Sequence, residues 1–221
     1  MKSKVGINGK MTSGKTTLAD HLIQQFNYQV ISVATPMKQL ATMFIDRVDQ
    51  DQIKSLSDQL FLDIHTKDTA FTNLQRVHQD FSHLTFAKDA KGQYHKTDSY
   101  RAFLQAIGST VRAQDEIAWV RYAATHANQL ADQGLRIVCD DIRTKDEKQT
   151  FEHYGFVIVR LDVDEDVQDQ RLLEMYGEIN HARKLDKTET DLDNETFDFR
   201  INNSNISVDQ TREAVVRFLQ Q

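Results

Sequence analysis

A glycine-containing stretch near the start of the chain has the residue types and the spacing that bind phosphate. Gly9 and Gly14 enclose four residues and are followed by Lys15 and Thr16, in the pattern G-x-x-x-x-G-K-T. Glycine at both ends lets the backbone curl so that successive N–H groups point inward at phosphate oxygens. The lysine can reach the β- and γ-phosphates of a nucleoside triphosphate, and the threonine hydroxyl is placed to bind Mg²⁺. The pattern therefore predicts ATP and Mg²⁺ as cofactors.

The elements on either side of this stretch fit a phosphate-binding loop. Lys4–Asn8 is a short apolar run and predicts a buried strand, and Thr16–Phe26 has leucines at helical spacing. A helix that begins at the loop adds its positive N-terminal end to the phosphate site. The residues expected to contact the ATP phosphates are Gly9, Met11, Thr12, Ser13, Gly14, Lys15, Thr16 and Thr17.

Strands and helices alternate in the rest of the two terminal parts of the chain. Further strands are predicted at Tyr28–Ala34, Leu135–Cys139, Phe156–Leu161 and Phe197–Ile201. Helical segments separate them, and Ser207 with Gln210 forms a capping box that opens a final helix. This alternation predicts an α/β fold with a parallel sheet covered by helices on both faces.

A long segment interrupts the alternation between the second and third strands. It is mostly helical by pattern and too long for an ordinary crossover, which needs a dozen or so residues. We therefore expect residues 1–35 and 131–221 to form the core, and residues 36–130 to form a helical insertion.

Composition excludes some classes of protein. With 27 Lys and Arg against 33 Asp and Glu, the net charge of −6 argues against a nucleic-acid partner, which requires a basic surface. The single cysteine, Cys139, excludes an intrachain disulfide and lies in an apolar run that suits a buried thiol. Neither a secretory apolar segment nor a membrane-spanning stretch is found, so we expect a cytoplasmic protein without a membrane partner. Whether the chain forms a homodimer is left open.

Three further patterns follow the loop along the chain. They are A-x-P-x-K at Ala34–Lys38, R-x-x-L-Q-x-x-G at Arg101–Gly108, and D-x-R-x-x-x-E at Asp141–Glu147. Together with the loop, their order and spacing resemble the phage-type deoxynucleoside monophosphate kinases, a branch of the P-loop nucleoside monophosphate kinase superfamily. The resemblance covers most of the chain, although each of the three patterns is weak by itself.

The resemblance implies a five-stranded parallel sheet, a helical acceptor-binding region at 36–130, and a mobile lid. Lys38, Arg101 and Arg143 would then face the acceptor, with the arginines clamping phosphate through their paired N–H groups. Gln105 would read the base of the acceptor. The alternatives are surface ion pairs for the two arginines and an exposed amide for Gln105.

Asp141 lies at the carboxyl end of a predicted strand, where open α/β sheets bind their ligands. It could hold Mg²⁺ through water or accept a proton from the acceptor, and its alternative role is to cap the following helix. Asp140 is adjacent and could share the role, so the division between the two stays open.

The lid implied by the resemblance spans about 164–193, with Arg171 and Arg183 as its candidate phosphate ligands. Cations that arrive when a lid closes are expected in phosphoryl transfer, but a solvated surface is the simpler interpretation of so polar a segment. The stretch Gly177–Asp193 has few apolar residues to anchor it, so we expect it to be mobile without ligand.

These observations predict an enzyme that uses ATP to phosphorylate a deoxynucleoside monophosphate to the diphosphate, with Lys15, Asp141 and Arg143 as catalytic residues. Its partner would be this small-molecule substrate. Dephospho-coenzyme A and phosphomevalonate kinases are alternatives on the same scaffold. A nucleotide-binding regulator without catalysis is the alternative from another class.

Overall fold

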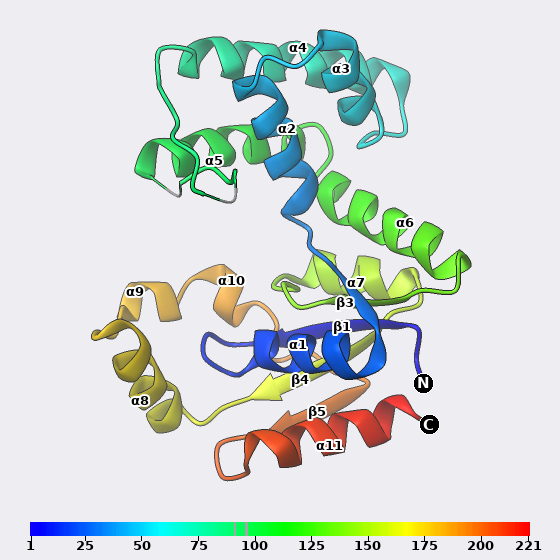
Figure 1. The fold of residues 1–221 in the computed structure, drawn as a ribbon, viewed down its shortest axis with the longest axis vertical. Helices are drawn as coiled ribbons and strands as arrows, with labels where there is room; N and C mark the ends of the chain where they lie inside the picture. The colour runs from blue at the N-terminus through cyan, green and yellow to red at the C-terminus, as the bar shows by residue number, and fades with distance from the viewer. Residues whose placement is uncertain (91, 96) are drawn as a thin grey trace. The chain divides into compact units, whose positions relative to one another are not determined.

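The structure is a computed structural model that describes residues 1–90, 92–95 and 97–221. It divides into two compact units (Figure 1). Unit 1 comprises Met1–Ser32 and Ala124–Gln221, and unit 2 comprises Val33–Ala123. Each unit has a hydrophobic core of its own.

Unit 1 is built on a five-stranded parallel sheet in the order β2-β3-β1-β4-β5. Its strands are β1 (Lys4–Gly9), β2 (Tyr28–Ile31), β3 (Arg136–Cys139), β4 (Val157–Asp162) and β5 (Phe199–Asn202). The central strand pairs through Val5 with Val138 on one side and Val157 on the other. Because all five strands are parallel, their carboxyl ends lie along one edge of the sheet, where such folds bind ligands.

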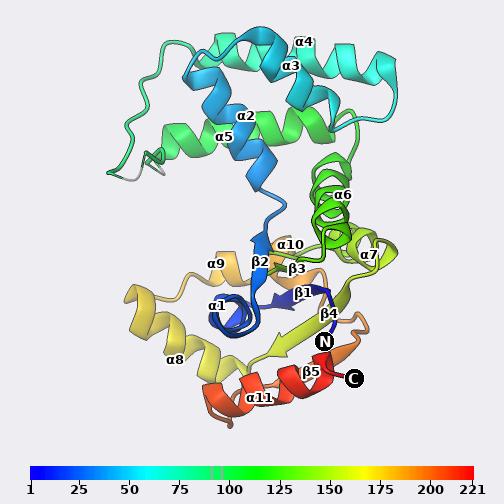
Figure 2. The same cartoon turned by 45° about the vertical axis from the view of Figure 1, so that its right-hand side comes forward.

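Helices cover both faces of this sheet (Figure 2). Helices α1 (Lys15–Phe26) and α11 (Val208–Leu219) cover one face, since Leu22 and Val215 share a core with Ile7 of β1. On the opposite face, α7 (Lys145–His153) packs against β4. The inner strands β3, β1 and β4 are mostly buried, as expected for a parallel sheet covered by helices on both faces.

Gly6 of β1 lies beneath closely packed side chains. A Cβ atom there would approach side-chain carbons of Ile142 and Ile158 to 2.4 and 2.6 Å. The glycine therefore permits the close packing of the segment after β3 onto β1.

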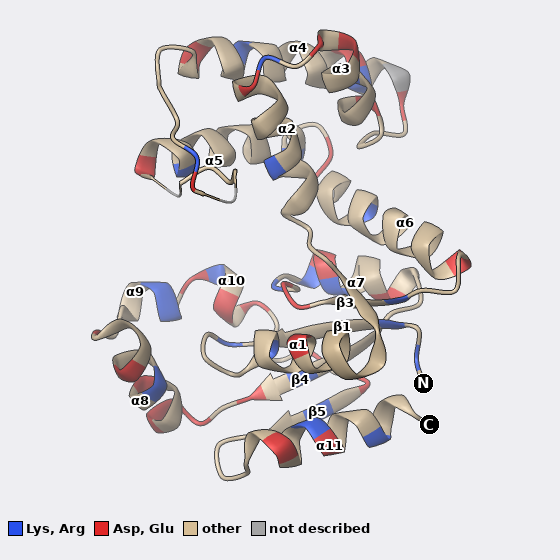
Figure 3. Ribbon diagram, in the orientation of Figure 1, with Lys and Arg blue, Asp and Glu red and all other residues tan. Residues whose placement is uncertain are grey.

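The C-terminal part of unit 1 carries three helices between β4 and β5. They are α8 (Glu165–Tyr176), α9 (His181–Lys184) and α10 (Lys187–Thr190). Asn180 caps α9 and Asp186 caps α10 through side-chain hydrogen bonds. The segment returns to the core at Leu192, which is 1% exposed. Figure 3 shows charges of both signs along these helices.

Unit 2 is helical in the part of it that the structure describes, apart from one isolated antiparallel bridge between Lys88 and Tyr94. Its helices are α2 (Thr35–Ile45), α3 (Gln50–Asp58), α4 (Ile64–Phe81), α5 (Asp98–Arg112) and the first turns of α6 (Ala118–Asp132). Phe44, Leu74 and Phe103 lie in its core. The glycine of the R-x-x-L-Q-x-x-G pattern, Gly108, lies where α2 approaches α5, since a Cβ atom there would be 3.0 Å from the sulfur of Met37.

Boundaries differ from the sequence prediction mainly where strands end. The second strand stops at Ile31 instead of Ala34, because Ala34 already caps α2 and Pro36 occupies its first turn. The predicted capping box of Ser207 and Gln210 is confirmed at the start of α11.

Within the described residues, no helix has both the length and the apolar character needed to cross a membrane.

Candidate active site

The loop between β1 and α1 has the strained backbone that a phosphate-binding turn requires. Gly9 has φ 156° and Gly14 φ 90°, and Thr12 between them adopts φ 60°. A Cβ atom at Gly9 would lie 2.4 Å from the Ser13 hydroxyl and 2.6 Å from the Leu161 carbonyl oxygen, so only glycine fits there. Left-handed threonine is uncommon, and such conformations concentrate at functional sites. The loop therefore has the shape that the sequence predicts.

The start of α1 offers free N–H groups to a ligand. Gly14 is the N-cap, and no side chain in the described part of the protein caps this end of the helix. The first N–H groups of a helix have no partner within the helix, and together with the helix dipole they attract anions. The Ser13 hydroxyl is buried and has no hydrogen-bond partner among the residues that the structure describes.

Lys15 lies folded across the loop. Its ammonium donates to the carbonyl oxygens of Gly9 and Lys10 at 2.6 and 2.8 Å. Burial lowers the pKa of Lys15 to about 8, and the positive charge of Arg143 acts in the same direction. An ammonium that is already stripped of water is well suited to neutralise phosphate charge.

Thr16 at the end of the loop and Asp140 directly after β3 are paired through their side chains. The Thr16 hydroxyl donates to the Asp140 carboxylate at 2.9 Å. Asp141 instead accepts hydrogen bonds from the Ser32 hydroxyl and the Cys139 thiol. The structure thus places Asp140, one residue before the predicted position, beside Thr16.

Hydroxyl and carboxylate oxygens are the ligands that Mg²⁺ prefers, so Thr16 and Asp140 fit the metal that the loop implies. Asp141 does not cap the following helix. Thr144 does so, in a capping box with Glu147.

Arg143 follows β3 and is held at two points. Its backbone N–H donates to the Glu147 carboxylate at 2.7 Å, and its guanidinium donates to Glu189 of α10 at 2.9 Å. The partner of the guanidinium is therefore an acid of the predicted lid. Burial raises the pKa of Glu147, while the N–H groups of Arg143 and Thr144 oppose the shift.

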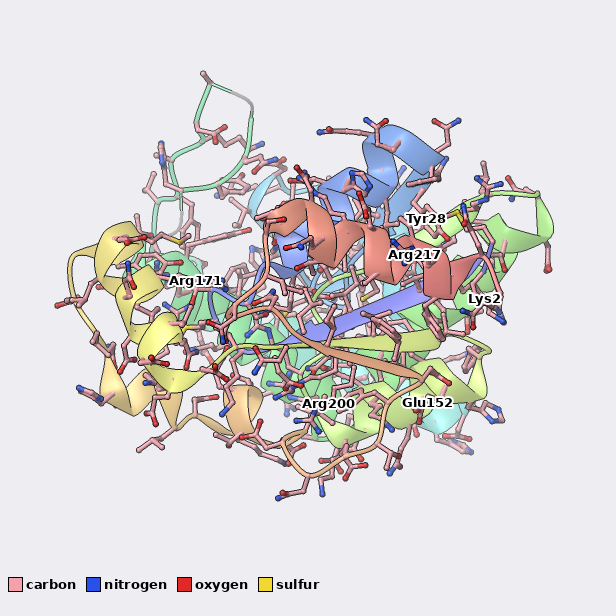
Figure 4. All side chains as sticks on the ribbon, turned by 90° about the horizontal axis from the view of Figure 1, so that it is seen from below. Lys2, Tyr28, Glu152, Arg171, Arg200 and Arg217 are labelled. Carbon is pink, nitrogen blue, oxygen red and sulfur yellow. The ribbon has the colours of Figure 1, made fainter. Side chains whose placement is uncertain are left out.

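A cavity of about 220 Å³ lies between the loop and the start of α11. It is lined by the loop residues Thr12 to Gly14, by Thr17 and Leu18 of α1, and by Arg171, Asn203, Ile206, Val208, Thr211 and Arg212. Arg171 extends from α8 (Figure 4) and donates to the Thr12 carbonyl and to the side chain of Asn203. The Asn203 amide donates in turn to the Ser13 carbonyl at 2.7 Å. Arg171 thus lies against the loop, and its contact with phosphate stays a prediction.

Arg183, the second candidate phosphate ligand of the lid, lines a smaller cavity of about 120 Å³ together with Met11. Lys184 is another cation of the predicted lid segment, and it pairs with Glu165 and Asp169 of the same segment.

Gln168 was not predicted, although it is buried on α8 and donates to the Met11 carbonyl at 3.1 Å. No pattern in the sequence distinguishes this glutamine from the surface amides around it.

Unit 2 contains a larger cavity, of about 740 Å³, that brings two of the predicted acceptor residues together. Lys38 of α2 and Arg101 of α5 both line it. The other lining residues are Thr35, Gln39, Thr42, Met43, Leu56, Gly92, Gln93, Tyr94, Tyr100, Leu104 and Tyr122. Gln105 does not line this cavity and lies exposed on α5. The three tyrosines were not predicted, because they come from separate segments.

Neither a family model nor a curated protein matches the sequence. Solved structures do share its fold. A sugar kinase from Janibacter, solved without ligand, aligns over 100% of this chain and 95% of its own with a TM-score of 0.53 and 15% identity.

An uncharacterized protein from Eubacterium ventriosum covers 100% of this chain and 99% of its own, with a TM-score of 0.52 and 14% identity. A Thermus thermophilus protein covers 98% and 95%, with a TM-score of 0.50 and 14% identity. At such identities the likeness shows the fold alone. The α/β class and the five-stranded parallel sheet with helices on both faces are confirmed.

Proposed function

We propose that the chain transfers the γ-phosphoryl group of ATP to the phosphate of a small metabolite, with a deoxynucleoside monophosphate as the acceptor. The observation that carries the proposal is the loop at residues 9–16. It combines left-handed backbone at Thr12 and Gly14, an uncapped helix start and a desolvated ammonium at Lys15. This combination suits the polyphosphate of a nucleoside triphosphate.

The donor would bind with its phosphates on the loop and its base in the 220 Å³ cavity. Arg171 presents a guanidinium held by the Thr12 carbonyl and by Asn203, and aromatic rings stack well on such planar groups. Thr16 and Asp140 would hold Mg²⁺, which when bound supplies positive charge to the phosphate oxygens.

The cavity of unit 2 is suited to an acceptor that carries a phosphate together with an aromatic or apolar part. Lys38 and Arg101 supply positive charge, whereas Tyr100, Tyr122 and Leu104 supply surface for a ring. Binding pockets of this kind combine apolar walls with a few polar groups that fix orientation. The choice of a deoxynucleotide follows from the resemblance of the motifs, and the cavity is compatible with it.

The transfer would proceed by in-line attack of an acceptor phosphate oxygen on the γ-phosphorus. The bond from this phosphorus to the β–γ bridging oxygen breaks as the new P–O bond forms, and ADP leaves. A phosphate oxygen is already a nucleophile near neutral pH, so no strong general base is required. Lys15 and the loop N–H groups would neutralise the charge on the donor, and Arg143 would fix the transferring group or the acceptor phosphate.

The test is ADP release from MgATP with a panel of acceptors. The panel contains deoxynucleoside and ribonucleoside monophosphates, dephospho-coenzyme A, phosphomevalonate and a sample without acceptor. We expect turnover with at least one deoxynucleoside monophosphate and its loss in Lys15→Ala. Turnover with only a different acceptor would reassign the substrate. Tight ATP binding without turnover on any acceptor would indicate a nucleotide-binding regulator instead.

A further inference from the structure

A carboxylate of the chain itself occupies the phosphate-binding loop. Glu189 lies on α10, more than 170 residues from the loop, and one of its oxygens accepts a hydrogen bond from the Met11 backbone N–H at 2.6 Å. The other oxygen accepts from the guanidinium of Arg143 at 2.9 Å. The side chain of Glu189 is 4% exposed, whereas that of Arg143 is 40% exposed.

These contacts are the ones that a phosphate group would make. A backbone N–H of the loop and an arginine N–H both point at one compact anion, as they do in phosphate sites. The negative charge of Glu189 also raises the pKa of Lys15, against the lowering by burial, so the carboxylate lies within electrostatic reach of the loop lysine. Glu189 therefore interacts with three groups that the proposed function assigns to the donor phosphates or to the transferring group.

The two anions cannot both accept the hydrogen of the Met11 N–H. The Met11 N–H carries a single hydrogen and donates it to Glu189. A nucleoside triphosphate on the loop would also bring several negative charges close to a buried carboxylate, which is strongly unfavourable. Donor binding must then move Glu189 away from the Met11 N–H.

We propose that Glu189 occupies the place of the donor's terminal phosphate in the free protein, and that the arriving donor displaces it and thereby releases Arg143. The inference rests on the proposed function in one respect, because it takes the loop to be the site of a triphosphate. The released guanidinium of Arg143 is then free to bind the phosphate of the acceptor. The donor thus competes with an internal anion, and its affinity is lower than the loop alone would give.

The chain around Glu189 has further anchors that hold it in this position. Asp191 accepts from the Lys145 N–H at 2.9 Å, and Asp193 pairs with Lys10 and Arg160 at 3.0 and 2.8 Å. None of these contacts uses the Met11 N–H, and the pair with Lys10 reaches the loop itself. The turn of α10 that carries Glu189 can therefore move away while Asp191 and Asp193 hold the rest of the segment.

The sharpest test is Glu189→Gln, which keeps the size of the side chain and removes its charge. Glu195→Gln is the matched control, since it removes a charge from the same part of the chain, where Glu195 pairs with Lys145 and makes no contact with the loop. Binding of a non-hydrolysable ATP analogue and of inorganic triphosphate is measured by calorimetry for both variants and the wild-type protein. We expect Glu189→Gln to bind both ligands about tenfold more tightly, the scale of one charge-assisted hydrogen bond, and Glu195→Gln to stay within about twofold of wild type.

Equal or weaker binding by a folded Glu189→Gln, with normal binding by the wild type, would overturn the inference and leave the proposed function intact. No binding by any of the three proteins would overturn both. Binding by Glu189→Gln, with none by the wild type or Glu195→Gln, would support the inference, because the carboxylate would then block the donor site completely. If the variant does not fold, hydrogen exchange on the wild-type protein decides. The ATP analogue alone should raise exchange in residues 187–190, and unchanged or slower exchange there would refute the displacement.

Discussion

The loop of unit 1 and the cavity of unit 2 are both lined by cations, but the cations are in different states. In the loop, Lys15 donates to two carbonyl oxygens and Arg143 is paired with a buried carboxylate. In the cavity, the Lys38 ammonium has no hydrogen-bond or ion-pair partner among the described residues. Arg101 is 63% exposed, with Asp98 as its carboxylate neighbour at 3.8 Å. One set of charges is held by the chain and the other is available to solvent.

This difference indicates how each region would recognise phosphate. A preorganised loop loses little entropy when a ligand binds, but its internal hydrogen bonds must be exchanged for those of the ligand. Exposed side chains bind without displacing a partner, but they must be ordered on binding, which costs free energy. Substitutions in the loop should therefore have the larger effects, and those in the cavity should affect the acceptor alone.

The largest effect is expected for Lys15→Ala, which removes the desolvated ammonium from the donor site. The rate of phosphoryl transfer should fall at least about a hundredfold, because a fixed charge at the transition state is lost. Lys10→Ala is the matched control, since Lys10 lies in the same loop and pairs with Asp193 at a half-exposed site. Single-turnover ADP formation measures both. A Lys15→Ala variant as active as Lys10→Ala would contradict the assigned role of the loop lysine.

A smaller and more selective effect is expected for Arg143→Lys. Lysine keeps the charge but loses the planar pair of N–H groups, so the acceptor's KM should rise about ten- to hundredfold. The KM for ATP should change little, because the loop N–H groups and Lys15 hold the donor. Steady-state kinetics with each substrate varied in turn separates the two. Equal changes for both substrates would indicate a structural role through Glu147 or Glu189.

The sequence predicts a region well when the residues that form it are consecutive, and poorly when they come together only on folding. The loop is built from consecutive residues, so its pattern defines its chemistry, whereas Arg171 was assigned to a lid only through the family resemblance. The strands could be predicted because short runs rich in β-branched residues, such as Val157–Val159, are typical of strands that are covered on both faces. The number of strands followed from the resemblance, and their order was not predicted, since no local pattern encodes it.

Residues that meet only after folding escaped prediction. Glu189 lies in a polar segment whose composition favours a solvated surface, yet it is buried against the loop. Asp140 and Asp141 are adjacent, and the sequence does not show which of them faces Thr16, because that depends on where β3 ends. Tyr94, Tyr100 and Tyr122 line one cavity from three separate segments, which no spacing rule could have indicated.

In the cavity, Arg101→Ala should raise the acceptor's KM about tenfold, the cost of one charge-assisted hydrogen bond at an exposed site. Gln105→Ala is the matched control, since Gln105 lies one turn further along α5 and does not line the cavity. It should change the KM by less than about twofold, although the motif resemblance assigns it to the base. Initial rates at varied acceptor concentration measure both variants. A larger effect at Gln105 than at Arg101 would move the acceptor site away from this cavity.

The smallest expected effect is the change of donor affinity with pH, which the Lys15 ammonium of the loop causes. With its pKa lowered to about 8, Lys15 loses its proton within the range in which the protein can be studied, whereas an exposed lysine stays charged there. Phosphate oxygens favour the ammonium, so donor binding should raise this pKa and take up a proton. Affinity for the donor therefore falls as the pH rises through 8. If only the charged form binds, the dissociation constant should increase about fourfold between pH 7 and pH 8.5.

Lys15→Arg separates the titration of the protein from that of the nucleotide, because arginine remains charged over this range. Its affinity for the ATP analogue should be lower at every pH than that of the wild type, since the longer, planar side chain fits the loop less well. Its dependence on pH should be that of the nucleotide alone, and the ratio of the two dissociation constants should isolate the lysine. Calorimetry in buffers of different ionisation enthalpy gives the proton uptake directly. A wild-type affinity that is independent of pH after this correction would mean that the Lys15 ammonium does not contact the phosphates of the donor.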